Sequence, residues 1–256
     1  MDKLDFAIKV SRKVGNILLS EWGGPMSISQ KSSFQDLVTD MDKKVQEMIV
    51  SSIRKKFPSD GILAEEGVND SSDKMWVIDP IDGTVNFAFG LPSFSISIAY
   101  VENGEPSVGV VHLPVLNETY YAIKNGGAYK NGERIRVSNR KRLRESLGLM
   151  GFFRGFSGKF LSDLEDKVVR IRMLGSIAVG VSYIAAGKAD FYVAKRSNPW
   201  DVAAAILILR EAGGKVTDFS GKEEGIFGKE YVFSNGYVHD ELLMRLSLIQ
   251  NLRVVK

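Results

Sequence analysis

The spacing of the apolar residues changes twice along the chain, and these changes restrict the fold more than any other feature. The first two apolar segments have helical spacing, and the second opens at Thr39, an expected N-cap with Asp42 three residues later. Residues 61–123 then follow the period of two that β-strands show. The remainder alternates strands with helices. The pattern predicts an α+β half over residues 1–135 and an α/β half over residues 136–256, packed as one compact body.

The side chains that the chain contains limit its chemistry. It has no cysteine and two histidines, His112 and His239. A disulfide framework, a thiolate nucleophile and a cysteine-ligated metal are therefore excluded, and a zinc site with several histidines is nearly excluded. A bound metal would have mostly oxygen ligands, which favours Mg²⁺, Mn²⁺ or Ca²⁺.

Charge and hydropathy bear on partners and location. The chain has 34 basic and 31 acidic residues, a balance too even to predict a nucleic-acid or membrane partner. The longest strongly apolar run, Val202 to Leu209, is far shorter than the ~20 residues that span a bilayer. The N-terminus lacks the apolar core of a signal peptide. A cytoplasmic location without membrane contact is expected.

The segment from Arg134 to Arg144 is strongly basic and contains six arginine and lysine residues. It admits two interpretations, a solvated connector or a patch for RNA or a protein partner. The connector is favoured, because no aromatic residues are interleaved with the charges.

The most informative segment is acidic and runs from Trp76 to Phe87. An apolar strand brings Asp79 to its end, and the following turn contains Asp82 before a short helix opens at Thr84. Two such carboxylates would hold a hard cation, and the amides that open the helix would hold an anion. The alternative is that both aspartates merely cap the turn and the helix.

Further acidic residues lie at equivalent points of other segments. Glu65 directly follows a buried strand, and Asp201 precedes an apolar helix, where it would also serve as an N-cap. Asp40 and Asp42 form another pair at the start of the second helix. Each acidic segment alone is a moderately specific sign of a metal site, whereas the order and completeness of the whole set are very specific.

The whole set resembles the inositol monophosphatase family, within the lithium-sensitive phosphatase superfamily. The resemblance covers nearly the whole chain in matching order. It rests on Asp36-Leu-Val-Thr-Asp40-Met-Asp42, Ala64-Glu65-Glu66, Trp76-Val-Ile-Asp-Pro-Ile-Asp-Gly-Thr84, Asn86-Phe87, Gly175-Ser176, Ala185-Ala-Gly187-Lys-Ala-Asp190, Pro199-Trp200-Asp201 and Glu211-Ala-Gly-Gly214.

The resemblance implies a layered αβαβα sandwich of the inositol monophosphatase/fructose-1,6-bisphosphatase type, with two or three Mg²⁺ ions where its halves meet. The implied metal ligands are Glu65, Asp79, the Ile81 carbonyl, Asp82 and Asp201. The implied catalytic residues are Thr84, Asp42 and Glu65. The implied substrate-binding residues are Asp82, Gly83, Thr84, Gly175, Ser176 and Ile177. Such a site would activate a water and stabilise the leaving alkoxide without a phosphoenzyme.

The chain departs from animal members of the family near its predicted pocket. They carry a glutamate that contacts inositol hydroxyls at the position of Ala194, and this chain offers Lys195 and Arg196 beside it. These residues form either a solvated loop or a second phosphate contact, for which Arg196 is the candidate. The region from Met150 to Lys159, rich in phenylalanine and glycine, is expected to shape the pocket or a subunit contact.

The expected activity is Mg²⁺-dependent hydrolysis of inositol 1-phosphate to inositol and phosphate, with fructose 1,6-bisphosphate as a further substrate. The alternatives are a 3′(2′),5′-bisphosphate nucleotidase, which generally needs a longer chain, a secondary role as an RNA polymerase partner in antitermination, and a non-catalytic metal-binding protein. The expected partner is a small sugar or cyclitol phosphate rather than nucleic acid. The resemblance favours a homodimer and leaves a tetramer open.

Overall fold

The computed structural model describes residues 2–24, 27–30, 37–70 and 72–251. The helices within these residues are α1 (Lys3–Glu21), α2 (Asp40–Lys56), α3 (Thr84–Ala88), the 3₁₀ helix η1 (Leu143–Glu145), α4 (Ser157–Leu164), α5 (Ile177–Ala185), α6 (Pro199–Glu211) and α7 (His239–Asn251). The strands are β1 (Ile28–Gln30), β2 (Leu37–Thr39), β3 (Gly61–Ala64), β4 (Val68–Asp70), β5 (Lys74–Asp82), β6 (Ser95–Glu102), β7 (Glu105–Leu113), β8 (Glu118–Ile123), β9 (Gly127–Lys130), β10 (Glu133–Arg134), β11 (Leu147–Met150), β12 (Arg170–Arg172), β13 (Phe191–Lys195), β14 (Lys215–Thr217) and β15 (Glu230–Ser234).

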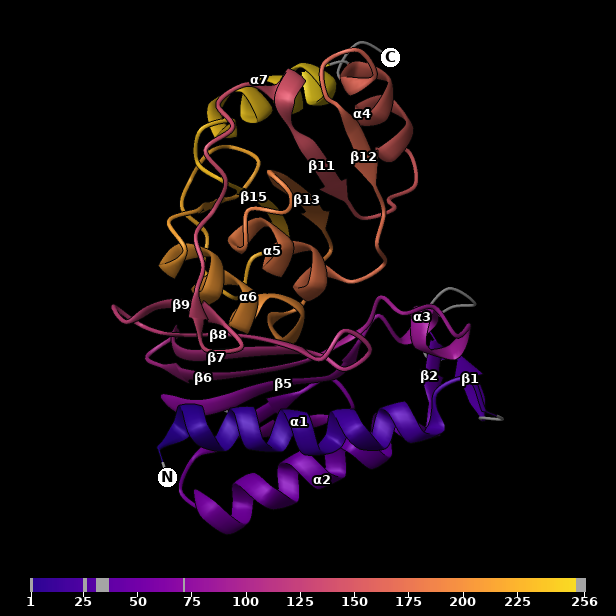
Figure 1. Ribbon diagram of the computed structural model, residues 1–256, viewed down its shortest axis with the longest axis vertical. Coiled ribbons are helices and arrows are strands. Elements are labelled where there is room, and N and C mark those ends of the chain that lie inside the picture. Colours follow the sequence, from indigo (N-terminus) through magenta and orange to yellow (C-terminus); the bar gives the residue numbers. More distant parts are fainter. Residues whose placement is uncertain (1, 25–26, 31–36, 71, 252–256) are drawn as a thin grey trace.

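The elements stack in five layers that alternate helices with sheets (Figure 1). Helices α1 and α2 cover one face of an eight-stranded sheet, and α5 and α6 lie between that sheet and a five-stranded one. Helices α4 and α7 cover the far face of the smaller sheet. The predicted α+β class and αβαβα sandwich are confirmed. Among the described residues, no helix is both long and apolar enough to cross a membrane.

The strand order places several strand ends on common edges. The larger sheet runs β10-β9-β8-β7-β6-β5-β3-β4, with β3 and β5 as parallel neighbours. The smaller sheet runs β12-β11-β13-β15-β14, and β11 is parallel to both β12 and β13. The loops that follow parallel neighbours therefore emerge at the same edge, which is where open α/β sheets bind ligands. The chain leaves the larger sheet after β10, and the division at residue 135 stays a prediction about domains.

Helix α6 forms the centre of the middle layer. Its run from Val202 to Leu209 is buried on all sides, because the larger sheet covers one side of the helix and α5 and the smaller sheet cover the other. Gly109 of β7 lets the helix backbone approach the sheet. A Cβ added there would lie 2.8 Å from the carbonyl oxygen of Ala204. This close contact fixes the height of α6 above the sheet.

The basic connector between the sheets is partly anchored. Asp190, with no exposed surface, accepts hydrogen bonds from the Arg140 Nε at 2.8 Å, the Leu147 amide at 2.8 Å and the Ser138 hydroxyl. The other basic side chains of the segment from Arg134 to Arg144 are exposed. Arg140 thus forms a structural ion pair with Asp190, and the other five basic side chains of the segment lie on the surface.

Two sequence expectations about local structure were wrong. Strand β5 does not end at Asp79 but continues to Asp82, with a shift of register against β6 between these two residues. Pro80 supplies no amide hydrogen to the ladder, so the strand bulges instead of turning. Helix α6 begins at Pro199, with Asn198 as its N-cap, because proline suits the first helical position. Asp201 is therefore the third helical residue rather than the cap.

We predict that Gly109→Ala lowers the free energy of unfolding by about 1–3 kcal/mol, because the new methyl group forces α6 away from β7. Urea unfolding followed by circular dichroism measures the change. Gly158→Ala is the matched control, since a Cβ at Gly158 would meet no atom within 4 Å. Equal unfolding midpoints for wild type and Gly109→Ala would contradict the close approach.

Candidate active site

Most of the predicted site residues line one cavity of about 290 Å³ where the two sheets meet. Those in its wall are Glu65, Asp79, Ile81, Asp82, Gly83, Thr84, Gly175, Ser176, Ile177 and Asp201. Asp42 is outside the wall but contacts Thr84, and Arg196 is exposed and outside it. Asp36, part of the first family motif, lies outside the described residues.

The bulge at the end of β5 presents two carboxylates on neighbouring parts of the cavity wall. The Ile81 amide donates to Asp79 Oδ1 at 3.0 Å, which holds that side chain against the bulged backbone. Gly83 follows with φ of 98°, a left-handed conformation that favours glycine, and a Cβ there would approach the Ser93 carbonyl oxygen to 2.9 Å. Helix α3 can therefore begin at Thr84 directly beside the carboxylates.

Thr84, half-buried in the cavity wall, contacts the buried Asp42 behind it. Thr84 Oγ1 lies 3.0 Å from both Asp42 Oδ1 and the Ile81 carbonyl oxygen. Asp42 Oδ2 accepts from the amide and hydroxyl of Thr39, at 2.8 and 2.6 Å, in the predicted capping box of α2. Burial raises the pKa of Asp42 to about 6 despite these donors.

The middle layer holds Asp82 at the start of α5. The Ser176 hydroxyl donates to Asp82 Oδ2 at 2.5 Å, and the Ala178 amide donates to the same oxygen at 2.7 Å. The Ile177 amide lies 3.3 Å from Oδ1. Ser176 is also the N-cap of α5, accepting from the Val179 amide. A carboxylate at a helix N-terminus is favoured by the helix dipole.

Asp201 approaches the same cavity from α6. Its Oδ2 accepts from the Asn198 amide at 2.7 Å, which completes a reciprocal capping box. Asp201 therefore takes part in capping α6 from the third helical position.

The acids repel one another in this site. Burial, followed by the charges of Glu65, Asp82 and Asp201, raises the pKa of Asp79 well above its usual value. Burial and nearby acids also raise the pKa of Asp82 to about 6 and that of Asp201 to about 8, against the hydrogen bonds that each accepts. Ionisation of these groups is therefore unfavourable without a compensating positive charge.

The donor set suits a hard divalent cation. Its ligand atoms would be carboxylate and carbonyl oxygens, the class that Mg²⁺ and Ca²⁺ prefer, and their mutual repulsion would be relieved by positive charge. As the side chains stand, no three acids or histidines among the described residues already converge into a closed metal-binding group. Oxygens of Asp79, Asp82 and Asp201 are instead turned to hydrogen-bond donors of the protein.

The smaller sheet contributes the other wall of the cavity. The loops after β11, β12 and β13, three parallel strands, all emerge at the edge that faces the acids. The loops after β11 and β12 bring Phe152 and Gly175 into the wall, and Lys195, the last residue of β13, also lies in it. The expectation that the Met150 to Lys159 region shapes the pocket agrees with the place of Phe152. Lys195 pairs with Glu230 at 2.7 Å.

Sequence reasoning missed Tyr192. Its side chain is buried in the cavity wall, and burial together with Asp82 and Asp201 raises the pKa of its phenol. A buried tyrosine in a strand usually indicates core packing. The signal that could have found it is its place nine residues before Asp201, in the strand that leads to the α6 helix carrying that acid.

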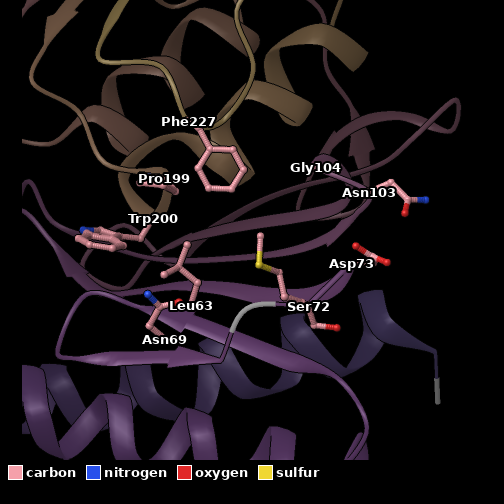
Figure 2. Close-up of a pocket in the computed structure, with 10 residues that line it drawn as sticks. Leu63, Asn69, Ser72, Asp73, Asn103, Gly104, Pro199, Trp200 and Phe227 are labelled. Carbon is pink, nitrogen blue, oxygen red and sulfur yellow. The ribbon is translucent and has the colours of Figure 1, made fainter.

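A second, larger cavity of about 560 Å³ lies beside Trp200 (Figure 2). Figure 2 shows Phe227 projecting toward Leu63, with Asn69, Asp73 and Asn103 around the opening. Among the described residues that line it, Asp73 is the charged one, so no set of ligands converges there. Trp200 is half-buried and lines this cavity.

Comparison with known proteins agrees with this geometry. The sequence profile of the inositol monophosphatase family matches residues 2–251. A fructose-1,6-bisphosphatase/inositol-1-monophosphatase of Thermotoga maritima is 54% identical over 243 residues, 95% of each chain. The Nus factor SuhB of Escherichia coli is 34% identical over 265 residues, 98% of this chain and 95% of that protein.

Solved structures show the same likeness. The Thermotoga maritima IMPase superposes with a TM-score of 0.95 at 52% identity, covering 98% of this chain and 99% of that one. The inositol monophosphatase of Anabaena (Nostoc) sp. PCC 7120 gives a TM-score of 0.85 at 31% identity, covering 96% and 95%.

Fold and acidic site together define a phosphomonoesterase of the metal-dependent class, which acts on small phosphate substrates. The chain belongs to the inositol monophosphatase family.

We predict that Asn86→Ala destabilises the junction of the two sheets. The Asn86 amide group donates to the Ser93 carbonyl at 2.6 Å and to the Leu174 carbonyl at 2.7 Å, so it ties α3 to the loop before α5. Loss of both bonds should lower the free energy of unfolding by about 1–3 kcal/mol. Thermal unfolding measures this change.

The matched control for Asn86→Ala is Asn139→Ala, whose side chain is exposed. If Asn86→Ala unfolds at the wild-type temperature, the two hydrogen bonds of Asn86 do not hold the junction together.

Proposed function

We propose that this enzyme hydrolyses inositol 1-phosphate to inositol and phosphate, with Mg²⁺ as its metal. The observation that carries the proposal is that Glu65, Asp79, Asp82 and Asp201, from the larger sheet and the middle layer, line one cavity. The resemblance of the chain to proteins named for inositol monophosphatase and fructose-1,6-bisphosphatase supports the substrate class.

The metal ligands that we propose are the four carboxylates and the Ile81 carbonyl oxygen. Bound Mg²⁺, in two or three copies, would supply a water of lowered pKa and positive charge against the phosphate and the leaving oxygen. The protein's own part is to hold the acids at fixed places. The bulge of β5 positions Asp79, and the first turns of α5 and α6 position Asp82 and Asp201.

Thr84 and Asp42 orient the water that attacks phosphorus. Donation of the Thr84 hydroxyl proton to Asp42, at 3.0 Å, leaves the lone pairs of Thr84 Oγ1 as acceptors toward the cavity. A water that donates to Thr84 then turns its own lone pair away from that hydroxyl. Asp42 is held by Thr39 so that it can accept this proton, and Glu65 would accept another from the water.

The amides of Gly83 and Thr84 would bind the phosphate at the start of α3, and Asp82 would contact it beside them. The loop of Gly175, Ser176 and Ile177 lies in the opposite wall and would face the alcohol. The Ser176 hydroxyl already donates to Asp82, so its backbone is the part available to substrate.

Fructose 1,6-bisphosphate is the second substrate that we propose. Its distal phosphate requires positive charge, and Lys195 stands in the cavity wall with Arg196 exposed beside it. Since Glu230 already pairs with Lys195, Arg196 is the more available cation for a mobile second phosphate.

A role in antitermination is a second candidate, favoured by the relatives named Nus factor SuhB. The exposed basic side chains of the Arg134 to Arg144 segment would be the contact surface. Replacing Arg136 and Arg144 by glutamine should then abolish capture by RNA polymerase and leave phosphatase activity unchanged.

The activity is tested by Mg²⁺-dependent phosphate release from inositol 1-phosphate, fructose 1,6-bisphosphate and adenosine 3′,5′-bisphosphate. We expect turnover of the first two, and a loss on the order of 100-fold or more in Asp82→Asn, which removes one proposed ligand charge. Preference for the adenosine bisphosphate would favour the nucleotidase alternative. Turnover that Asp82→Asn leaves intact would refute the proposed site.

Metal binding should stabilise the fold more strongly at pH 8 than at pH 5.5. Because the folded-state pKa values of Asp82 and Asp201 are raised to about 6 and 8, their ionisation destabilises the metal-free protein as pH rises through this range. Bound Mg²⁺ would offset this loss of stability, and at low pH protons compete with Mg²⁺ for the carboxylates. At ~100 times its Kd, it should raise Tm at pH 8 by about 5–10 °C.

Differential scanning fluorimetry with and without MgCl₂ measures this shift. Asp82→Asn should reduce it, whereas Asp240→Asn, an exposed acid on α7, should leave it unchanged. An equal shift at both pH values would contradict a site built from these buried carboxylates.

A further inference from the structure

We propose that Phe152 is a specificity residue that packs its ring against the C–H face of a cyclic substrate alcohol. The inference rests on the proposed function, because it names the part of the cavity that recognises the ring. Phe152 lies in the cavity wall but outside the acidic motifs.

Phe152 is a large apolar side chain in an unusual setting. It lines the cavity and is 70% exposed, whereas the neighbouring Phe156 and Phe160 are 3% and 0% exposed. Exposed apolar surface at a cavity mouth typically marks a place where a ligand binds. The ring can therefore become covered when a substrate enters.

The backbone on both sides of Phe152 is anchored, so the ring projects from a fixed point. The Gly151 amide donates to the Val193 carbonyl of β13 at 3.2 Å. The Phe153 amide donates to the hydroxyl of Ser157 at 2.7 Å, and that hydroxyl lies 3.3 Å from the Gly151 carbonyl oxygen. A contact on such a rigid support costs less conformational entropy on binding.

Phe152 and Phe153 both line the cavity but differ in their packing. The half-buried Phe153 ring packs against the apolar cluster of α4 and α7, and it lies so close to Gly151 that a Cβ there would approach its Cζ to 2.4 Å. Glycine at residue 151 therefore leaves room for the Phe153 ring against this cluster. Phe152, in contrast, remains 70% exposed in the cavity wall.

The topology places Phe152 where the ring of the substrate must lie. The phosphate end of the cavity is formed by the acids and α3, and the loops after β11 and β12 together with β13 form the opposite wall. A cyclitol or a sugar has a face of C–H bonds that its hydroxyl groups polarise. The negative face of an aromatic ring attracts such a surface and shields it from water.

The test compares a cyclic with an open-chain substrate, inositol 1-phosphate and glycerol 2-phosphate. For Phe152→Ala we expect KM for inositol 1-phosphate to rise about tenfold, equivalent to about 1.4 kcal/mol, with kcat within twofold of wild type. The kcat/KM for glycerol 2-phosphate should stay within twofold. Phe152→Trp should restore the wild-type KM, because it restores an aromatic face.

The matched control is Phe89→Ala, which removes a ring of equal exposure, 71%, that does not line the cavity. It should leave both substrates unaffected. An unchanged KM for inositol 1-phosphate in Phe152→Ala would overturn the inference. So would an equal loss on both substrates, which would indicate a structural or assembly role. Absence of turnover of either substrate by wild type would instead overturn the proposed function.

Discussion

The repulsion among buried carboxylates is the constraint on which the rest of the structure depends. Asp79 and Asp82 are buried and Asp201 is half-buried, and the charges of neighbouring acids raise the pKa of each. Their burial is tolerable because each accepts hydrogen bonds from backbone amides, at the β5 bulge or in the first turns of α5 and α6. The donors come from different layers, so the site exists only when those layers have assembled.

The middle layer consequently has two roles. Helix α6 is the apolar core between the sheets, and it also carries Asp201 in its first turn. Helix α5 packs beside it and presents amides to Asp82. Small shifts in this layer would move the acids relative to one another, which is why Gly109, distant in sequence from the motifs, contributes to the geometry of the site.

The two walls of the cavity come from different parts of the fold. The acids and Thr84 belong to the larger sheet or to helix starts, whereas Phe152 and Gly175 lie in loops after β11 and β12, and Lys195 ends β13. Loops on a rigid sheet can change without disturbing the acids. The wall opposite the acids is thus the part of this cavity that can vary while the acids stay in place.

The sequence by itself determined the class of fold and the identity of the acids. Helical and two-residue periods are local consequences of backbone geometry, so α1, α2 and the strand before Asp79 could be predicted, as could the capping box of Thr39 and Asp42. The tertiary structure alone decided the bulge of β5, the rim position of Phe152 and the place of Tyr192 beside the acids. These features depend on strand register and on contacts between residues far apart in the chain, which local spacing does not encode.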